Sequence, residues 1–442
     1  MEANSSSTGH FAALIAFVVL VSFRYCRLMG NLIGAVCYHP FPIPAHPAIT
    51  HRDCTVIMPI VDLDNPHLEQ CIRSILSNRV YALILVTVGR NRRNRLYDVI
   101  RELRLEFPST GIHVGAVPQA NKRSQIAHAI PQLTTGITIL ADDRVFWHER
   151  FLTAALAPFT NEAVGGVFTN RRIRREATGF SWNSFWGFIE SVYVSSLNYE
   201  TRATNAIDGS VKVIEGQTAL YRTEIIQAPE FVEAFQNECF FFGKYGPIAA
   251  GDDNFITQWL IQHDWHIAFQ STTNSCVEVP TRTASQFIDH CDRRGRNSWR
   301  SHATMLFCTP KAWKRFPWGA YAIHLSGLFN LSLFCDAALL TSFAFTWYAT
   351  EAPWMFAIPA AGIFLTKLIK PLPVLVQNPL DMFFIPGLIM FGYFHTLLEL
   401  KTLFTLYDRR WGRYGVADVE EGPDDEIGWL WGEGHEMRIL LS

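Results

Sequence analysis

The stretch Gly136-Ile-Thr-Ile-Leu-Ala-Asp-Asp143 decides the fold class that this sequence predicts. A short apolar run that ends in two carboxylates is typical of a buried strand that leads into a polar loop. Earlier in the chain a helical pattern covers Leu68–Leu76, and three similar runs predict strands: Cys54–Pro59, Leu83–Val88 and Ile112–Val117. Strands that alternate with helices predict an α/β domain with a parallel sheet and helices on both faces. Asp142 and Asp143 then lie at the carboxyl edge of the sheet, where such folds bind ligands.

The two ends of the chain are more apolar than this middle part. Of the 442 residues, 49% are hydrophobic and 18% are charged, and the apolar excess collects at the ends. Residues 11–23 form an unbroken apolar run before Arg24 and Arg27, which predicts an uncleaved membrane anchor whose C-terminal end faces the cytosol. A cleaved signal peptide is the alternative, but no Lys or Arg precedes the run. Among Asp, Glu, Lys and Arg, residues 321–349, 354–366 and 382–398 contain only Asp336, which predicts further membrane or interfacial helices.

Composition divides the chain into five parts. We expect a membrane anchor with an interfacial segment at 1–37, a Pro-rich linker at 38–52, the α/β domain at 53–302, interfacial and transmembrane helices at 303–406 and a polar tail at 407–442. The formal net charge of −2 gives no reason to expect a nucleic-acid partner. The nine cysteines are scattered without a C-x-x-C pair, which argues against a zinc site or a disulfide framework.

Two pairs of carboxylates stand out in the α/β domain. Asp142 and Asp143 follow a predicted buried strand, where loop carboxylates can hold a divalent cation that bridges a diphosphate; a solvated turn is the alternative. Asp252 and Asp253 in Gly251-Asp-Asp-Asn254 can supply a general base. The alternative for Asp253 is a helix N-cap before an expected helix at Phe255–Gln262, and both roles are compatible.

Basic residues gather at two places along the same domain. Lys122 and Arg123 follow a predicted strand, and four arginines crowd the segment around Trp299: Arg293, Arg294, Arg296 and Arg300. Guanidinium groups match phosphate oxygens, and an indole can stack on a sugar or a base. A basic face that meets lipid headgroups is the alternative. Together with the acidic pairs, these residues predict transfer of a group from a nucleotide diphosphate by an enzyme anchored in a membrane.

The order of these motifs resembles that of the membrane-integrated family 2 glycosyltransferases. The resemblance is closest to fungal capsular-type polysaccharide synthases and more distant to hyaluronan and cellulose synthases. It covers about residues 50–410 through Val56–Pro59, Asn121–Arg123, Ala141–Asp143, Ile207–Gly209, Glu215–Arg222, Gly251–Asn254 and Arg296–Ser301. The resemblance implies a cytosolic GT-A-like domain with a Rossmann-like parallel sheet, a nucleotide-sugar donor that is usually a UDP-sugar, Mg²⁺ or Mn²⁺, and inversion at the anomeric carbon.

The resemblance also assigns roles by position in the motifs. Asp142 and Asp143 match the metal and diphosphate motif, and Asp253, with Asp252 beside it, matches the general base. Residues expected to bind the donor are Lys122, Arg123, Asp64, Arg293 and Arg296. Residues expected beside the acceptor are Gly216, Gln217, Thr218 and Trp299. Asp64 is included because the family's acidic pair after the second strand is absent here; replacement by Asp62 or Asp64 is one expectation, and loss of that contact is the alternative.

One departure from the family pattern leaves the product open. The family's Q-x-x-R-W motif is His290-Cys-Asp-Arg-Arg294 here, so Arg294 replaces a tryptophan that normally contacts the acceptor. The leading expectation is sugar transfer to a growing polysaccharide by a multi-pass protein of the plasma membrane or an endomembrane. The alternative is single-sugar transfer to a lipid or a small lipophilic acceptor. An inactive membrane scaffold or a transporter is a further alternative, which the intact acidic and basic motifs disfavour.

Overall fold

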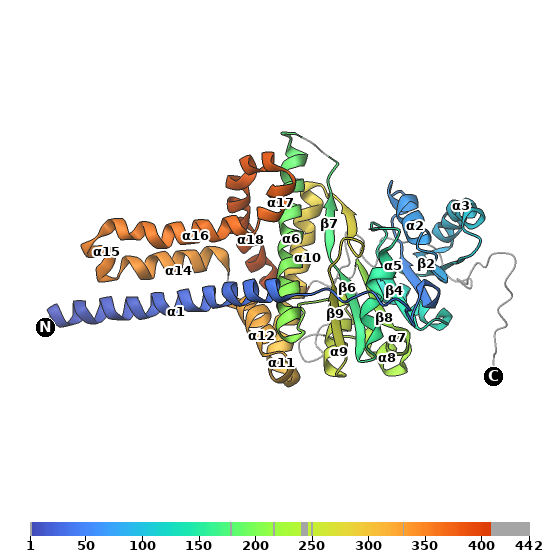
Figure 1. Cartoon of the computed structure of the whole chain (residues 1–442), viewed down its shortest axis with the longest axis horizontal. Helices are drawn as coiled ribbons and strands as arrows, with labels where there is room; N and C mark the ends of the chain where they lie inside the picture. Colours follow the sequence, from blue (N-terminus) through green and yellow to red (C-terminus); the bar gives the residue numbers. More distant parts are fainter. Residues whose placement is uncertain are drawn as a thin grey trace. The chain divides into compact units, whose positions relative to one another are not determined.

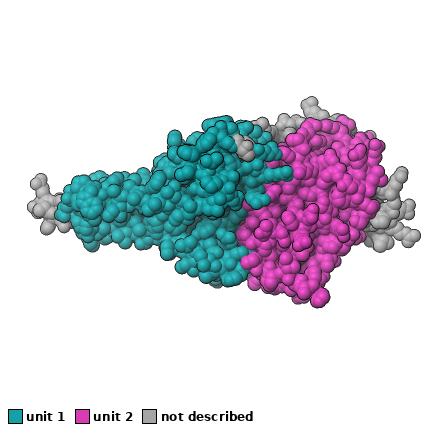
Figure 2. Space-filling view, turned by 45° about the horizontal axis from the view of Figure 1, so that its top comes forward, with its two compact units in different colours: residues 1–39, 172–212, 281–406 teal, residues 40–171, 213–280, 407–442 magenta. Residues whose placement is uncertain are grey.

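The computed structural model describes residues 2–176, 179–214, 217–239, 246–248, 251–329 and 331–407. The chain divides into two compact units (Figure 2). Unit 1 consists of residues 1–39, 172–212 and 281–406, and unit 2 of residues 40–171, 213–280 and 407–442. The predicted domain at 53–302 therefore contains segments of both units. Almost all of the predicted tail lies outside the described residues.

Unit 2 is built on a seven-stranded sheet with the strand order β3-β2-β1-β4-β8-β6-β9. Strand β1 pairs in parallel with β2 and β4, β2 pairs in parallel with β3, and β6 pairs in parallel with β9. The strands of this unit are β1 (Cys54–Pro59), β2 (Ala82–Val88), β3 (Gly111–Val117), β4 (Ile137–Ala141), β5 (Phe146–Trp147), β6 (Val164–Thr169), β8 (Thr218–Arg222), β9 (His266–Gln270) and β10 (Val277–Pro280). The short strands β5 and β10 pair with each other in antiparallel fashion.

The prediction of a wholly parallel sheet is wrong at β8, which runs antiparallel to both β4 and β6. A buried strand is apolar on both faces, and that pattern carries no signal of strand direction. The first four strands follow the prediction closely because each is a continuous apolar run between polar segments. The bounds of β1 and of helix α2 (Leu68–Leu76) agree with the predicted ones.

Helices α3 (Arg90–Glu106) and α4 (Lys122–Ala129) pack on the β2–β3 part of the sheet. The remaining helices of unit 2 are η1 (His51–Asp53), η2 (Ile130–Gln132), α5 (Phe151–Ala155), η3 (Ala157–Thr160), α7 (Thr223–Gln227), α8 (Pro229–Gln236) and α9 (Asp252–Gln262). Residues 38–50 form no helix or strand, and η1 begins within the last two residues of the predicted linker at 38–52. Part of this linker is fastened to unit 2, because the backbone of Phe41 exchanges two hydrogen bonds of 2.9 Å with the side chain of Gln270.

Unit 1 is helical apart from β7 (Arg171–Arg174), which begins at the boundary between the units. The long helix α1 (Glu2–Cys37) packs along α6 (Trp182–Asp208) and α14 (Ser332–Ala344), and α10 (Ala284–Ala303) packs along α18 (Ile385–Phe404). Helices α14 and α16 (Ala357–Ile369) lie side by side and are joined by α15 (Trp347–Glu351) (Figure 1). The shorter elements are η4 (Thr304–Cys308), α11 (Pro310–Arg315), α12 (Pro317–Gly319), η5 (Ala320–Leu325), α13 (Ser326–Phe329), η6 (Pro353–Phe356), α17 (Leu372–Gln377) and η7 (Pro379–Phe384).

Apolar helices are present at both ends of the chain, as predicted. Within the described residues, Thr8–Cys37 and Pro379–Phe404 are long and apolar enough to cross a membrane. A bent pair, Pro317–Phe329 with Ser332–Ala344, makes a third candidate if it forms one span. The apolar helix at Pro353–Ile369 is shorter. The predicted apolar segment at 354–366 falls within this helix.

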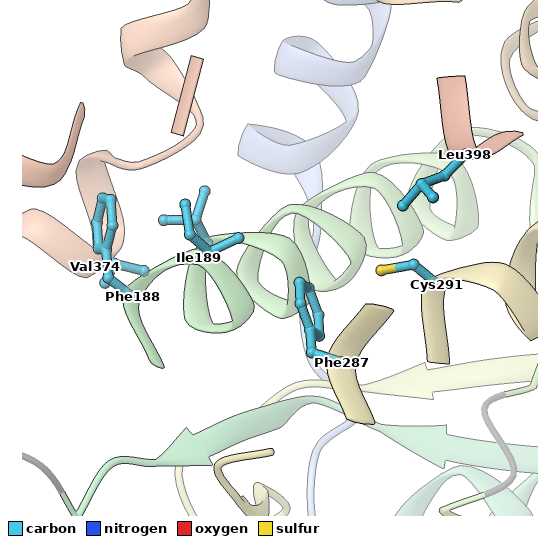
Figure 3. Packing of buried hydrophobic residues seen from close by; sticks show 7 residues of the cluster. Phe188, Ile189, Phe287, Cys291, Val374 and Leu398 are labelled. Atoms are coloured by element: carbon cyan, nitrogen blue, oxygen red, sulfur yellow. The ribbon is translucent and has the colours of Figure 1, made fainter. Parts of the chain in front are cut away.

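A buried hydrophobic cluster joins four helices of unit 1 (Figure 3). Its members come from α6, α10, α17 and α18: Phe188, Ile189, Val192, Phe287, Cys291, Val374 and Leu398. Helices α10 and α18 also approach closely at Gly295, where an added Cβ would lie 2.7 Å from Oγ1 of Thr402. Because interiors are close-packed, this cluster fixes α10 against the C-terminal helices.

Candidate active site

The predicted site residues of unit 2 lie at one edge of the sheet. Strands β1, β2, β3 and β4 are parallel neighbours, so their carboxyl ends share that edge. Asp62, Lys122 and Asp142 each follow one of these strands. Because β8 is antiparallel to β4, its first residue, Thr218, and the preceding Gln217 lie at the same edge. The antiparallel strand that the sequence did not predict therefore brings the expected acceptor loop beside the expected metal motif.

Lys122 joins the two acidic motifs. Its ammonium nitrogen lies 3.0 Å from Oδ1 of Asp142 and 3.0 Å from Oδ2 of Asp252. The side chains of Lys122 and Asp252 are 8% and 9% exposed, whereas that of Asp142 is 37% exposed. Burial lowers the pKa of Lys122, but the carboxylates of Asp142, Asp252 and Asp253 outweigh this effect and hold it above its ordinary value. Lys122 is therefore charged at neutral pH and fixes the relative positions of the two motifs.

The position of Lys122 follows from the start of helix α4. Asn121 is the N-cap residue, and its side chain accepts hydrogen bonds from the backbone N–H groups of Arg123 (3.0 Å) and Ser124 (3.4 Å). A cation in the first turn of a helix meets the positive end of the helix dipole, which is unfavourable. The two carboxylates that receive the ammonium group compensate for this cost.

The carboxylate of Asp143 is surrounded by more negative than positive charge. Burial and the neighbouring Asp142 raise the pKa of Asp143 to about 7, and Arg144, whose Nε is 3.9 Å away, counteracts them only in part. A hard cation prefers carboxylate oxygens and would relieve this excess of negative charge. The described residues contain no group of three or more His, Cys, Asp or Glu that could hold a metal. Asp142 and Asp143 thus fit a divalent cation that takes its other ligands from water and a diphosphate.

The second acidic pair opens helix α9. The helix begins at Asp252, and its N-cap is Gly251, which has a φ of 76° and makes no side-chain cap. The hypothesis that Asp253 caps a helix starting at Phe255 is therefore wrong, because a left-handed glycine ends the preceding loop and Asp253 already lies in the first turn. Oδ1 of Asp253 accepts a 2.8 Å hydrogen bond from the backbone of Asn254. The side-chain amide of Asn254 donates to the same oxygen at 3.3 Å.

Thr257 connects this first turn to the segment that precedes the acceptor loop. Its hydroxyl donates to the backbone oxygen of Asp253 (2.7 Å) and accepts from the backbone N–H of Ile214 (2.8 Å). Gly216 lies outside the described residues. Gln217 accepts a 2.9 Å hydrogen bond from the backbone N–H of Asp142, which extends the β4–β8 ladder by one residue.

The predicted donor residue Arg123 is buried, at 1% exposure. Its guanidinium donates to the backbone oxygens of Phe235 (2.7 Å) and Gly251 (3.2 Å), pairs with Glu238 and lies over the ring of Phe255. These contacts hold the start of α9 in place. Its role in donor binding stays a prediction, whereas the described contacts show a positioning residue.

Of the two acids considered for the nucleoside, Asp62 lies closer to the acidic group. Asp64 is 82% exposed and pairs with Arg95 on the surface at 2.8 Å. Oδ2 of Asp62 lies 3.1 Å from a guanidinium nitrogen of Arg144, and the charge of Asp62 contributes to the raised pKa of Asp143. The donor contact of Asp64 stays a prediction.

The remaining predicted residues lie on α10 in unit 1. Arg296 is 12% exposed and pairs with Asp292 at 2.9 Å, and the indole nitrogen of Trp299 donates to the backbone oxygen of Glu399 at 2.9 Å. Both Arg293 and Arg294 have interaction partners, and the guanidinium of Arg294 lies 5.8 Å from the ring centroid of Tyr193. Trp299 is thus anchored to α18. The roles of these residues toward donor and acceptor stay predictions.

Sequence reasoning missed several residues that shape this edge of the sheet. Arg171 is 8% exposed and donates to the side chain of Gln217 at 2.9 Å. The indole of Trp147 donates to Oγ1 of Thr218 at 3.1 Å, and Asn65 donates to the backbone oxygen of Asp143 at 2.9 Å. Each contact joins segments that are distant in the chain. The sequence signal that could have found Asn65 is its place in the loop after β1.

Known proteins resemble this chain in sequence and in structure. Residues 52–297 match the family model described as "Glycosyltransferase like family 2". A "Type 2 glycosyltransferase" of Gibberella zeae is 34% identical over 417 residues, which cover 92% of this chain and 77% of that protein. The hyaluronan synthase of Streptococcus pyogenes is 22% identical over 412 residues, 89% of each chain.

A solved structure shares the fold. The mannosyltransferase PcManGT from Pyrobaculum calidifontis, in complex with GDP-Man and Mn²⁺, superposes with a TM-score of 0.52 at 14% identity over 88% of this chain and 99% of that one. The mixed sheet of unit 2 and this likeness show a GT-A-like fold. With a family model that spans more than half of its length and a relative at 34% identity, the chain belongs to the family 2 glycosyltransferases.

Proposed function

We propose that this chain is an inverting glycosyltransferase that moves a sugar from a nucleotide-sugar donor to a growing saccharide at a membrane. The observation that carries the proposal is the convergence of Asp142 and Asp252 on Lys122, at 3.0 Å each. This places a candidate general base, Asp253, in the helix turn that begins beside a candidate diphosphate site. The mannosyltransferase of the same fold binds GDP-Man and Mn²⁺, which is a precedent for both ligands.

The reaction requires three tasks from the residues at this edge. Asp142 and Asp143 would hold Mg²⁺ or Mn²⁺, which supplies Lewis-acid stabilisation of the leaving diphosphate when bound. Asp253 takes the proton from the acceptor hydroxyl as its oxygen attacks the anomeric carbon. The bond between that carbon and the phosphate oxygen breaks, and the nucleoside diphosphate leaves with the electron pair. Attack opposite to the leaving group inverts the anomeric centre.

Lys122 fixes the relative positions of the residues that perform these tasks. It is charged, buried and bound to a carboxylate of each motif. Enzymes gain most from charges that are fixed before the reaction, because no reorganisation is then needed. Lys122 therefore acts here as a positioning residue between the metal motif and the base motif.

The membrane placement is part of the proposal. Thr8–Cys37 and Pro379–Phe404 are apolar enough to cross a bilayer, and Arg24 and Arg27 lie toward the C-terminal side of the apolar run in α1. Basic residues favour the cytosolic side. We place the catalytic unit in the cytosol of a multi-pass protein, where nucleotide sugars are available, in the plasma membrane or an endomembrane.

The proposed function has two versions, which differ in the acceptor that receives the sugar. Similarity to hyaluronan synthase over 89% of the chain supports polymer extension. Arg294, which replaces the family's tryptophan, lies over Tyr193 and supports the second version, single-sugar transfer to a lipid or a small lipophilic acceptor. The two versions share the same donor chemistry.

The experiment incubates purified full-length protein in detergent with radiolabelled UDP- and GDP-sugars and Mn²⁺, and then separates polymer, lipid extract and small glycosides. We expect label to enter one of these fractions with at least one donor, and to be lost with EDTA. Absence of both transfer and donor hydrolysis across the panel, with a folded protein, would refute the proposed function.

A further inference from the structure

Two groups of ion pairs connect helices of unit 1, and we call them the first and the second rung. In the first rung, Asp336 on α14 pairs with Arg24 on α1 and with Lys367 on α16 (2.8 Å), and it accepts a 3.0 Å hydrogen bond from the hydroxyl of Tyr393 on α18. In the second rung, Glu200 on α6 pairs with Arg27 on α1 (3.3 Å) and with Lys370 at the C-terminal end of α16 (3.5 Å).

The rungs are one helical turn apart on two helices at once. Arg24 and Arg27 are three residues apart on α1, and so are Lys367 and Lys370 on α16. Residues at this spacing lie on the same helix face. The two helices therefore present four cations in two layers, and each layer holds one carboxylate.

These four cations exceed their partners in charge. Their ion pairs in the described structure go to two carboxylates only, which leaves two positive charges without a protein counterion. Burial would raise the pKa of Glu200, but Arg27, Lys370 and Lys212 lower it to about 2, so a further cation acts on the second rung. Unbalanced charge beside apolar helices is costly, and an external anion would offset that cost.

The second rung is open to such an anion, whereas the first is closed. The side chains of Asp336, Arg24 and Lys367 are 5%, 16% and 16% exposed. In the second rung, Lys370 is 62% and Glu200 is 29% exposed. The side chain of Arg27 is 21% exposed, and its guanidinium also donates to the hydroxyl of Ser326 at 3.2 Å.

The apolar part of α1 indicates where the rungs lie in a bilayer. Residues 8–23 would extend about 24 Å at 1.5 Å per residue, which is close to the thickness of the hydrocarbon core. Arg24 and Arg27 then lie at the boundary between acyl chains and headgroups. If that boundary faces the cytosol, it belongs to the leaflet that carries anionic lipids.

We propose that Arg27 and Lys370 form a binding site for the phosphate of an anionic phospholipid headgroup. The phosphate oxygens accept from the exposed part of the Arg27 guanidinium and from the ammonium of Lys370, and the acyl chains lie along the apolar helices. Glu200 holds the two cations apart and so sets the width of the site. The site rests on the proposed membrane placement, but it is separate from the sugar-transfer chemistry.

The test uses the full-length protein in neutral detergent and native mass spectrometry with three probes: dioctanoyl phosphatidylglycerol, dioctanoyl phosphatidylcholine and inorganic phosphate. We expect phosphatidylglycerol to bind about tenfold more tightly than phosphatidylcholine, and Lys370→Gln to weaken it roughly fivefold. Lys401→Gln is the matched control, because Lys401 is 60% exposed, close to the 62% of Lys370, and it also pairs with a carboxylate, that of Asp292. Lys370→Arg should retain binding.

Three results would overturn the inference. One is equal binding of the two lipids, the second is equal loss in Lys370→Gln and Lys401→Gln, and the third is binding of inorganic phosphate as tight as that of phosphatidylglycerol. Failure of the membrane placement has its own readout, since the protein would then stay in solution without detergent. Failure of the proposed sugar transfer would leave the lipid measurement unaffected.

Discussion

The ammonium group of Lys122 lies 3.0 Å from a carboxylate oxygen of Asp252, and both side chains are less than a tenth exposed. The same ammonium group lies 3.0 Å from Asp142, so the two carboxylate oxygens can be no farther apart than the sum of these distances. This relationship makes one site from two motifs that are far apart in the chain. It also gives the first prediction.

Replacing Lys122 with Met should lower the unfolding temperature, because it leaves the buried carboxylate of Asp252 without its cation. Loss of one partner of a buried pair costs about 3 kcal/mol. The double variant Lys122→Met/Asp252→Asn should recover part of this loss, which a thermal-unfolding double-mutant cycle measures. Arg95→Met, at a pair whose members are 61% and 82% exposed, serves as the control and should have little effect. Strictly additive effects in the cycle would show that Lys122 does not stabilise Asp252.

Asp143→Asn should weaken cation binding in the presence of nucleoside diphosphate by about tenfold or more, since it removes one of two carboxylate ligands. Mn²⁺ binding followed by electron paramagnetic resonance measures this directly. Without nucleotide, binding should be weak in the wild type also. Asp98→Asn, at an exposed site on α3, is the control. Wild-type affinity in Asp143→Asn, or transfer activity that survives exhaustive chelation, would remove the metal role.

The close approach of α10 and α18 makes two glycine substitutions behave differently. Gly295→Ala places a Cβ 2.7 Å from Oγ1 of Thr402, a fully buried residue, and should lower the unfolding temperature through overpacking of about 1–3 kcal/mol. Gly392→Ala, where nothing lies within 4 Å of the added Cβ, should not destabilise. Thermal unfolding of both variants in detergent measures the contrast. Equal effects would mean that α10 and α18 do not pack in this way.

Product length should depend on Arg294. A synthase that retains its chain needs an apolar or aromatic surface at the acceptor, and Arg294 occupies the position of the family's tryptophan. The single-transfer version of the proposed function predicts short products from the wild type and longer ones from Arg294→Trp, as measured by size-exclusion of labelled product. Trp299→Ala should impair acceptor binding, with Trp299→Phe as a control for its packing on α18. Long polymer from the wild type, unchanged in Arg294→Trp, would contradict this expectation.

Much of the fold could be predicted from local patterns, whereas most of the site geometry could not. Strand β1 and helix α2 were predicted to the residue because each is a short apolar or amphipathic segment with clear polar boundaries. The direction of β8 was not, because pairing with β4 and β6 is decided by contacts distant in the chain. Helix α1 is longer than the unbroken apolar run at 11–23, because the polar N-terminal residues and the largely apolar residues 28–37 are also helical.

The same limit applies to single residues of the site. The sequence identified Lys122, Asp142 and Asp252 as members of separate motifs, but their common contact depends on the sheet order. Arg123 follows Lys122 directly, yet the start of α4 turns it into the interior instead of toward the same carboxylates. Nothing in the local pattern separates the two cations. The different directions of Lys122 and Arg123 are set by their positions in the first turn of α4.

In the proposed reaction, Asp253 removes the proton from the acceptor hydroxyl during transfer. The most direct measurement is the initial rate of sugar transfer by Asp253→Asn, with the donor that the wild type uses and saturating Mn²⁺. Because Gly251 and not Asp253 is the N-cap of α9, the variant should fold and bind the nucleotide as the wild type does. We expect a rate lower by a factor on the order of 10², whereas Glu230→Gln, at an exposed site on α8, should leave the rate unchanged. Transfer by Asp253→Asn at close to the wild-type rate would contradict it.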